Sequence, residues 1–426
     1  MTNNAVQKPN WTVMVYMVAD TGDDFYQYAM KDITEMMKAR FDDQIKVVVH
    51  ANAPSPWPTR CWKVRGAPKV ENGKTSDRKI GVAEVIDCYA TGLLDFIQKS
   101  VDKYESEYYL LVLWGHGEGI DWKEKVLGNR PLSSPIEGVG KRFAPGSQGA
   151  TEVGELGKSL AELRLEKVSK KRVVVGFDAC LMGMVEVFDE MQQYVSWVVA
   201  ADDVIPDTGW PYTNILQLLG SRPDISPKEL AENIVSICAE WYSDPDQNPE
   251  SKVSFAACNL ANSERVSGAM TNLTNELTAC IQEPSVRKAV KEARDFAEDL
   301  QERAYVDLYA FCSDLIPKAE GKQEFRQLSY AARNVMLALD SFVGKFQFSD
   351  SYPFRYSKDA RAVSICFPES DDLVGTIPGH RISWGSYKDL RFCHTTHWPA
   401  FLVTFWGREP IETDQPTPKA LGQTAG

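Results

Sequence analysis

The chain has 426 residues, of which 43% are hydrophobic and 25% are charged, so it can bury a core and is not intrinsically disordered. It carries 47 Lys and Arg against 59 Asp and Glu, a net charge of −12, and this acidic balance argues against a nucleic-acid-binding protein. No apolar run reaches the roughly 18 residues of a membrane-spanning helix, so no membrane segment is predicted.

The first half of the sequence alternates between apolar runs of strand length and stretches with helical spacing. Runs that are apolar on both sides are typical of strands in a parallel sheet covered by helices on both faces. In chain order, the predicted elements are a strand over 11–20, a helix over 25–39, a strand over 45–53, a polar hairpin or surface excursion over 63–79, a helix over 91–104, a strand over 108–114, a long polar loop over 118–150, a helix over 151–165, a strand over 172–177, a helix over 181–193 and a strand over 196–201.

The second half of the sequence is mainly helical. One further strand is predicted over 253–259, helices over 263–345 with an interruption at 305–316, and a strand over 362–367 that returns to the sheet. The predicted organisation is a disordered segment over 1–10, an α/β core over 11–260, a C-terminal helical part over 261–408 whose late strand completes the fold, and a disordered tail over 409–426.

The nine cysteines are odd in number and scattered, and no two of them form a C-x-x-C pair. A zinc site or a disulfide framework is therefore not predicted, and most of the cysteines lie in apolar runs, as buried free thiols do. That pattern is typical of a reducing compartment. The polar N-terminus lacks the apolar core of a signal peptide, so the expected location is the cytoplasm, or outside it if a leader has been removed.

Two predicted strands end in reactive side chains. His116 follows the run YYLLVLWG, and Cys180 follows the run RVVVGFDA. In an open parallel sheet, ligands bind beyond the carboxyl ends of the strands. If these two strands are neighbours, His116 and Cys180 project into the same crevice and place a base beside a thiol.

A thiol and an imidazole in one crevice can cleave an amide. A free thiol has a pKa near 8.5, and a neighbouring imidazole together with the start of the helix predicted from 181 would favour the thiolate of Cys180. The thiolate attacks a carbonyl carbon, and His116 then protonates the leaving amine. The backbone N–H groups of Gly117 and Cys180 are the candidate donors to the oxyanion.

Each of these residues alone has a common structural explanation, because a strand-terminal histidine and a buried cysteine are both ordinary. Together, at the ends of two buried strands and flanked by Gly115, Gly117 and Asp178, they favour catalysis. The histidine pair His394 and His397 lacks the Glu of an H-E-x-x-H motif, so no metal site is predicted.

Three stretches of the chain are similar to one known family. They are WTVMVYMVAD from Trp11, LVLWGHGEG from Leu111 and VVVGFDACLMGMVEV from Val173, and weaker likeness extends over nearly the whole chain. They resemble the clostripain family of cysteine peptidases, which belongs to the caspase-like clan. The resemblance implies a caspase-like αβα sandwich with a mostly parallel central sheet, a dyad of His116 and Cys180, and cleavage after Arg or Lys.

The resemblance also implies acids that bind the basic side chain of the substrate. Asp178 matches the family's acid two residues before the nucleophile. The second acid falls in the loop after the next strand, where Asp202, Asp203 and Asp207 are available and Asp207, beside a Gly-Trp turn, is favoured. A guanidinium paired to a carboxylate in a desolvated pocket gives strong selectivity for a basic side chain.

Relatives can be activated by cleavage of their own chain between the dyad residues, and the predicted loop over 118–150 fits such a site. The favoured cut is at Lys141-Arg142, in a Gly- and Pro-rich stretch, with an ordinary surface loop as an equal alternative. Some relatives depend on calcium, and the resemblance keeps calcium as an alternative. The carboxylate clusters of this chain lack the spacing of a calcium loop, so no cofactor is expected to be required.

The leading hypothesis is an Arg/Lys-directed cysteine endopeptidase that acts on peptides or proteins as a monomer. One alternative is a peptidase or transpeptidase of other specificity. Another is a catalytically silent caspase-like scaffold that binds basic peptides. Retention of both His116 and Cys180 argues against the scaffold, which needs neither residue.

Overall fold

The structure is a computed structural model, and it describes the parts of the chain that form a central sheet and its covering helices. Residues 1–7 and 409–426, and most of the predicted loop over 118–150, lie outside the described residues. The described residues are 8–20, 23–55, 57–67, 80–86, 90, 92–117, 119–120, 142–143, 151–152, 169–246, 252–297, 300, 304–320, 325–351, 358–370, 374–375, 382–383 and 387–408.

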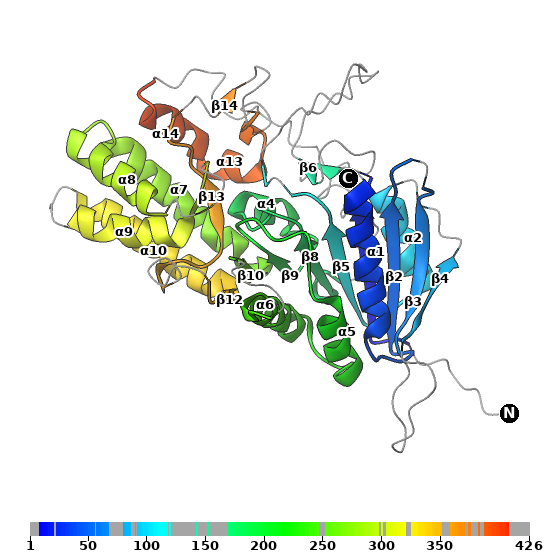
Figure 1. The fold of residues 1–426 in the computed structure, drawn as a ribbon. Helices are drawn as coiled ribbons and strands as arrows, with labels where there is room; N and C mark the ends of the chain where they lie inside the picture. Colours follow the sequence, from blue (N-terminus) through cyan, green and yellow to red (C-terminus); the bar gives the residue numbers. More distant parts are fainter. Residues whose placement is uncertain are drawn as a thin grey trace, which may run out of the picture.

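A nine-stranded sheet lies at the centre of the molecule (Figure 1). In spatial order its strands are β12 (Val343–Phe348), β10 (Ser254–Asn259), β9 (Trp197–Ala200), β8 (Val173–Asp178), β5 (Tyr108–Trp114), β1 (Trp11–Val18), β2 (Ile45–Asn52), β3 (Arg60–Arg65) and β4 (Val82–Ile86). The five strands from β9 to β2 are parallel. Antiparallel strands extend the sheet at both edges, with β10 and β12 on one side and β3 and β4 on the other.

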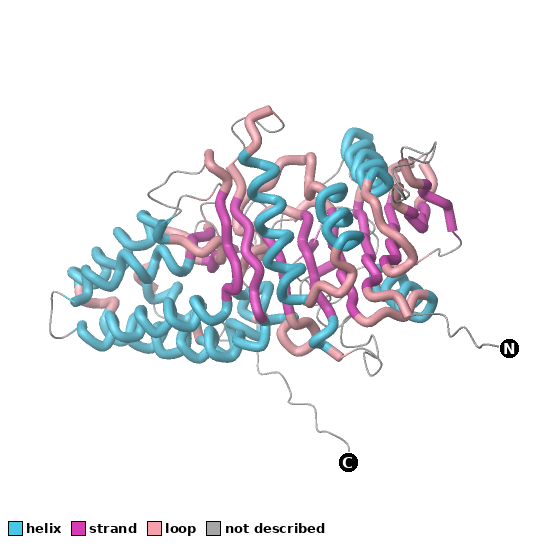
Figure 2. Tube along the Cα trace, turned by 90° about the horizontal axis from the view of Figure 1, so that it is seen from below, coloured by secondary structure: helices cyan, strands magenta, loops and turns pink. Residues whose placement is uncertain are grey.

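The middle strands are buried on both faces, which explains why the sequence shows continuous apolar runs instead of alternation. Two hydrophobic cores, one on each face of the sheet, cover them. One face carries α1 (Asp23–Lys38), α5 (Tyr212–Ser221) and α6 (Pro227–Ser243). The other face carries α2 (Leu93–Lys103) and α4 (Val185–Met191), so the strands lie between two helical layers (Figure 2).

The C-terminal helices gather at the β12 end of the sheet and continue the core of the α2 and α4 face (Figure 1). They are α7 (Ser263–Cys280), α8 (Pro284–Ala297), α9 (Leu308–Glu320), α10 (Arg326–Phe342), α13 (Arg391–Thr396) and α14 (Trp398–Phe405). One apolar cluster therefore contains residues from both sides of the boundary predicted at 260. Among the described helices, none is long and apolar enough to cross a membrane.

Two predictions for the C-terminal half are wrong in detail. The apolar run at 362–367 does not join the main sheet, because β13 (Ser364–Cys366) pairs antiparallel with β11 (Tyr305–Asp307) in a separate two-stranded sheet. The strand that does return to the main sheet is β12, which pairs with β10. Residues 308–316, predicted as an interruption, form the first part of α9. A short apolar run carries no information about which strand it will pair with.

Two predicted helix starts are also wrong. Thr151–Glu152 is a short strand, β7, paired antiparallel with β6 (Arg142–Phe143), where a helix was expected to begin; 153–165 lies outside the described residues. The helix predicted from 181 begins only at Val185, because Leu181 has a left-handed backbone with φ of 62°. A leucine in this conformation interrupts helical geometry, and its spacing in the sequence does not reveal it.

One cysteine departs from the prediction of free thiols. Cys61, in β3, is disulfide-bonded. The other cysteines of the described chain are free, and five of those seven are buried. Scattered spacing cannot reveal a pairing that the fold creates, which is why the disulfide was not predicted.

Candidate active site

His116 and Cys180 follow two strands that are immediate neighbours in the middle of the sheet. β5 and β8 pair in parallel with Trp114 opposite Asp178, and the Gly115 N–H donates to the Asp178 carbonyl at 3.2 Å. The expectation that the two strands are neighbours is therefore confirmed. Both residues stand at the carboxyl ends of adjacent parallel strands, which is where such sheets bind ligands.

The segments that follow the two strands are in close contact at Gly117. A Cβ built on Gly117 would lie 2.0 Å from the carbonyl oxygen of Cys180 and 2.9 Å from its backbone nitrogen. Only glycine permits this approach, since any side chain would meet backbone atoms that cannot rotate away. The structure thus brings together the two residues predicted to donate N–H groups to the oxyanion, and their role as donors stays a prediction.

The ring of His116 packs against helix α1. The exposed imidazole stacks on the Phe25 ring, with centroids 4.1 Å apart and an interplanar angle of 9°. Phe25 packs on Trp114 at 4.7 Å, and the Trp114 indole N–H donates to Asp32 Oδ2 at 2.7 Å. Sequence reasoning missed Phe25 and Asp32. The available signal was a carboxylate inside the apolar stripe of α1, directly before the buried Ile33.

The thiol of Cys180 is half-buried against the loop that follows β9. The Ile205 N–H donates to Sγ at 3.4 Å, and Sγ lies 3.6 Å from the Ile205 carbonyl oxygen. Burial raises the pKa of Cys180 to about 11; the Ile205 N–H opposes this, and the charges of Asp207, Asp178 and Asp203 add to it. The thiol is therefore protonated at neutral pH and needs a base before it can act as a nucleophile.

The expectation that a helix start favours the thiolate is wrong. The chain after Cys180 does not enter a helix, because α4 begins only at Val185. Instead, the Leu181 N–H donates to the Asp203 carbonyl at 3.1 Å, which ties this segment to the loop after β9. The helix macrodipole acts only within the first turn, so it gives the Cys180 thiolate no stabilisation.

Asp178 lies beneath the site, on the face covered by α1 and α5. The residue is 3% exposed, and Oδ2 accepts hydrogen bonds from the Trp210 N–H at 3.1 Å and the Tyr212 hydroxyl at 2.9 Å. Oδ1 has no hydrogen-bond partner within the described chain. Burial raises the pKa of Asp178 to about 7, and burial together with the charge of Asp178 raises the pKa of neighbouring Asp32.

The three acids of the loop after β9 differ in their access to solvent. Asp207 is exposed, and Asp203 is buried beside the thiol. Asp202 belongs to the core, because it is fully buried and accepts a hydrogen bond from Ser254. Burial raises the pKa of Asp202, and the charge of buried Asp307 raises it further. Of the three, Asp207 is the acid that an incoming side chain can reach directly.

The predicted self-cleavage position is only partly described. Arg142 lies in β6, and Lys141 lies outside the described residues. Within the described ranges, no three His, Cys, Asp or Glu side chains are grouped so that they could hold a metal ion. Self-cleavage and independence of calcium both stay predictions.

Comparisons with known proteins point to one family of cysteine proteases. The model of the clostripain family matches residues 15–406. A similar solved structure is that of a secreted cysteine protease from Bacteroides thetaiotaomicron in complex with an irreversible peptide inhibitor, at 18% identity and TM-score 0.57, covering 92% of this chain and 99% of that one. Another is an inactive zymogen protease from Parabacteroides distasonis, at 14% identity and TM-score 0.57, with the same coverage.

No curated protein sequence matches this chain significantly. At identities this low, the two solved structures bear on the fold alone. They agree with the helix-covered, mostly parallel sheet described above, and the predicted caspase-like αβα fold is confirmed.

Proposed function

Because this chain belongs to the clostripain family of cysteine proteases, we propose that it is an endopeptidase that cleaves peptide bonds after Arg or Lys. The observation that carries the proposal is the packing of Gly117 against the Cys180 backbone at the ends of β5 and β8. This contact joins the segment that carries the imidazole to the segment that carries the thiol. The charges of Asp207 and Asp178 both raise the pKa of the same thiol.

The proposed reaction uses His116 as base and then as acid. The imidazole takes the proton of the Cys180 thiol as Sγ attacks the scissile carbonyl carbon. The N–H groups of Gly117 and Cys180 receive the negative charge on the carbonyl oxygen. The imidazolium then protonates the leaving amine, and water, deprotonated by the same imidazole, releases the acid from the thioester.

The proposed specificity comes from two acids at different depths. Asp207 is exposed and meets the guanidinium or ammonium group first, and the unpaired oxygen of Asp178 attracts it from below. A cation bound there offsets the negative charge that raises the pKa of Cys180. Binding of the correct side chain therefore also eases ionisation of the nucleophile.

Hydrolysis of short amides tests the proposal. Substrates that differ only in the residue before the cut, Arg, Lys, Gln or Leu, are compared on the wild type, Cys180→Ala and His116→Ala. We expect hydrolysis after Arg and Lys, and its loss by at least about a thousandfold in both variants. Cys280→Ala is the matched control, because Cys280 is also a free, half-buried thiol but lies in α7. Equal hydrolysis of all four substrates would show that Asp178 and Asp207 do not select the side chain before the cut.

The scaffold alternative is tested by covalent labelling. A peptide that ends in Arg and carries a thiol-reactive group should modify Cys180, and mass spectrometry of the digested protein identifies the modified residue. Binding without modification would favour the scaffold.

Self-processing is tested in parallel, by N-terminal sequencing of fragments from the wild type and from Cys180→Ala. We expect a new N-terminus after Lys141 or Arg142 in the wild type only.

The disulfide at Cys61 bears on the compartment in which the protein works. Disulfides persist in oxidising environments and are rare in the cytosol. We therefore favour a location outside the cytoplasm over the cytoplasmic alternative. Mass spectrometry of the native protein, digested without reductant, should find Cys61 in a cross-linked peptide, and a free Cys61 thiol would withdraw this argument.

A further inference from the structure

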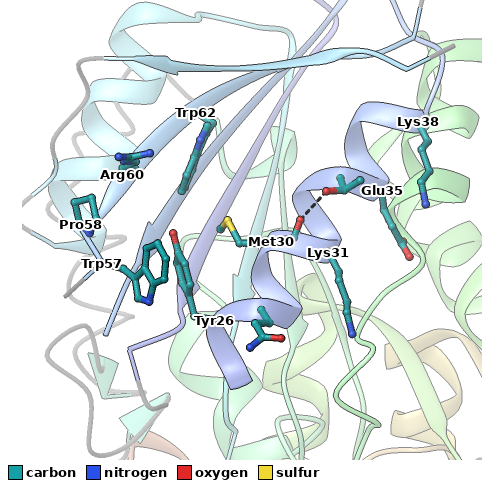
Figure 3. A pocket seen from close by; sticks show the side chains of 11 residues that line it. Tyr26, Met30, Lys31, Glu35, Lys38, Trp57, Pro58, Arg60 and Trp62 are labelled. Carbon is teal, nitrogen blue, oxygen red and sulfur yellow. Dashed lines mark hydrogen bonds between the residues drawn. The ribbon is translucent and has the colours of Figure 1, made fainter. Parts of the chain in front are cut away.

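A groove lies over the outer surface of α1 (Figure 3). On the β3 side, Tyr26 and Met30 of the helix face Trp57 and Trp62, whereas Lys31, Glu35 and Lys38 lie on the opposite flank of the helix. The volume of the groove is about 880 Å³. The α1 wall from Tyr26 to Lys38 is about 18 Å long at 1.5 Å per residue, which is the length of about five extended residues. The groove is therefore large enough for a peptide segment.

One end of the groove is aromatic. Trp57 is 57% exposed and stacks with Tyr26, with ring centroids 6.2 Å apart and an interplanar angle of 22°. Figure 3 shows the Trp57 and Tyr26 rings side by side, with Trp62 farther along the same wall. Exposed tryptophan and tyrosine side chains beside a groove are typical of surfaces that bind an apolar or aromatic side chain of a partner.

The charged side chains of the groove are mainly cationic. Lys31, Lys38 and Arg60 line it, all three are exposed, and none forms a salt bridge with another described residue. The acid of the lining, Glu35, faces the start of α5; burial raises its pKa, and Lys38 together with the backbone N–H groups of Tyr212 and Thr213 opposes this rise. On a chain of net charge −12, such a groove selects an acidic occupant.

The groove lies on the histidine side of the candidate active site. Phe25, which stacks on His116, directly precedes Tyr26 at the aromatic end of the groove. Asp207, proposed to bind the side chain before the cut, belongs to the loop after β9, whose Ile205 contacts the Cys180 thiol. A substrate that crosses the site from this loop to His116 therefore extends toward the aromatic end of the groove with the residues after the cut, whose amine His116 is proposed to protonate.

We propose that this groove binds the part of a protein substrate that follows the scissile bond, and that it favours acidic residues accompanied by an aromatic or aliphatic side chain. The inference rests on the proposed peptidase activity and adds a second determinant of substrate choice. The aromatic pair Trp57 and Tyr26 takes the apolar side chain, and Lys31, Lys38 and Arg60 attract the carboxylates.

The test compares substrates that share everything up to the cut. Two internally quenched peptides carry the same sequence through Arg, followed by about ten residues that contain Phe and either Glu or Lys. A short Arg amide, with no residues after the cut, reports the basal activity. The enzymes are the wild type, the double variant Lys31→Glu/Arg60→Glu, Trp57→Ser, and the control Lys288→Glu, which changes an exposed lysine of α8.

We expect the wild type to favour the Glu peptide over the Lys peptide by about tenfold in kcat/KM, the effect of a few partly screened charge pairs. Lys31→Glu/Arg60→Glu should abolish or reverse this preference, and Trp57→Ser should lower kcat/KM for both peptides about threefold to tenfold. All variants should hydrolyse the Arg amide like the wild type.

Three results would overturn the inference, and they have two different meanings. Normal hydrolysis of the amide with no preference between the peptides, or a preference that Lys31→Glu/Arg60→Glu leaves intact, refutes the groove and spares the proposed function. Absence of hydrolysis of the amide and of both peptides refutes the proposed function, and the inference with it.

Discussion

Replacement of Gly117 by alanine should separate the two strand ends that carry the candidate site. The new Cβ would stand 2.0 Å from the Cys180 carbonyl oxygen and 3.0 Å from the Cβ of Ala179, whereas ordinary contacts of this kind begin at 3.4 Å. The obstructing oxygen belongs to the backbone and cannot rotate away. The segment that carries His116 therefore has to move away from Cys180 by about 1 Å or more.

This displacement predicts a large loss of activity and a small loss of stability. A misplacement of about 1 Å between reacting groups costs about a hundredfold in rate. Overpacking of a buried contact costs about 1–3 kcal/mol, which lowers Tm by a few degrees in a protein of this size. The Gly117→Ala protein should thus stay folded while kcat/KM for an Arg amide falls about a hundredfold.

The assay pairs hydrolysis of the Arg amide with thermal unfolding followed by circular dichroism. Gly268→Ala is the control, because Gly268 lies in α7 and a Cβ there meets nothing within 4 Å. That variant should be fully active and more stable by about 0.5–1 kcal/mol, since alanine favours helix more than glycine. Retention of at least a third of wild-type activity by Gly117→Ala would refute the reasoning.

Three further predictions concern charge and stability. Asp207→Asn removes a charge that raises the pKa of Cys180. Alkylation of this thiol by iodoacetamide near pH 8 should therefore accelerate about threefold, as measured by peptide mass spectrometry. An unchanged rate of alkylation would contradict this prediction. Burial raises the pKa of Asp178 to about 7, so the wild type should become less stable as pH rises from about 4 to 7, where the carboxyl group ionises more readily in the unfolded chain. Between pH 5 and pH 8, the Tm of Asp178→Asn should therefore fall less than the Tm of the wild type. Equal falls in Tm would count against the raised pKa. Ser226→Ala breaks the capping box in which Ser226 Oγ accepts the Glu229 N–H at 3.3 Å. Urea unfolding should show that the free energy of unfolding falls by about 1 kcal/mol. An unchanged free energy of unfolding would mean that the cap is not needed.

The strands of the sheet are the part of the fold that the sequence predicts best. β1, β5 and β8 are buried on both faces, so their apolar runs are continuous and need no tertiary information to be recognised. The start of α4 is different, because it depends on the left-handed backbone of Leu181 and on its bond to Asp203. The partner of β13 depends likewise on the position of β11. Both are set by contacts between distant segments.

In the candidate site too, local sequence identifies some residues, whereas contacts between distant segments determine the others. His116 and Cys180 can be found from the sequence because each follows a strand signal and the strands are neighbours. Phe25 and Ile205 contact those two side chains from α1 and from the loop after β9, and only the fold brings these segments together. The high pKa of Cys180 was missed for this reason, since it comes from burial and from acids that the sequence places up to 27 residues away.

The order of the strands determines what a cut between the dyad residues would do to the molecule. β1 to β5 precede the segment that contains Lys141 and Arg142, whereas β8, β9, β10 and β12 follow it, and the seam between the two groups is the buried β5–β8 ladder. A nicked protein would therefore elute from gel filtration as a single particle. Its two polypeptides would part only in denaturant, because neither half can shield its exposed seam from water alone.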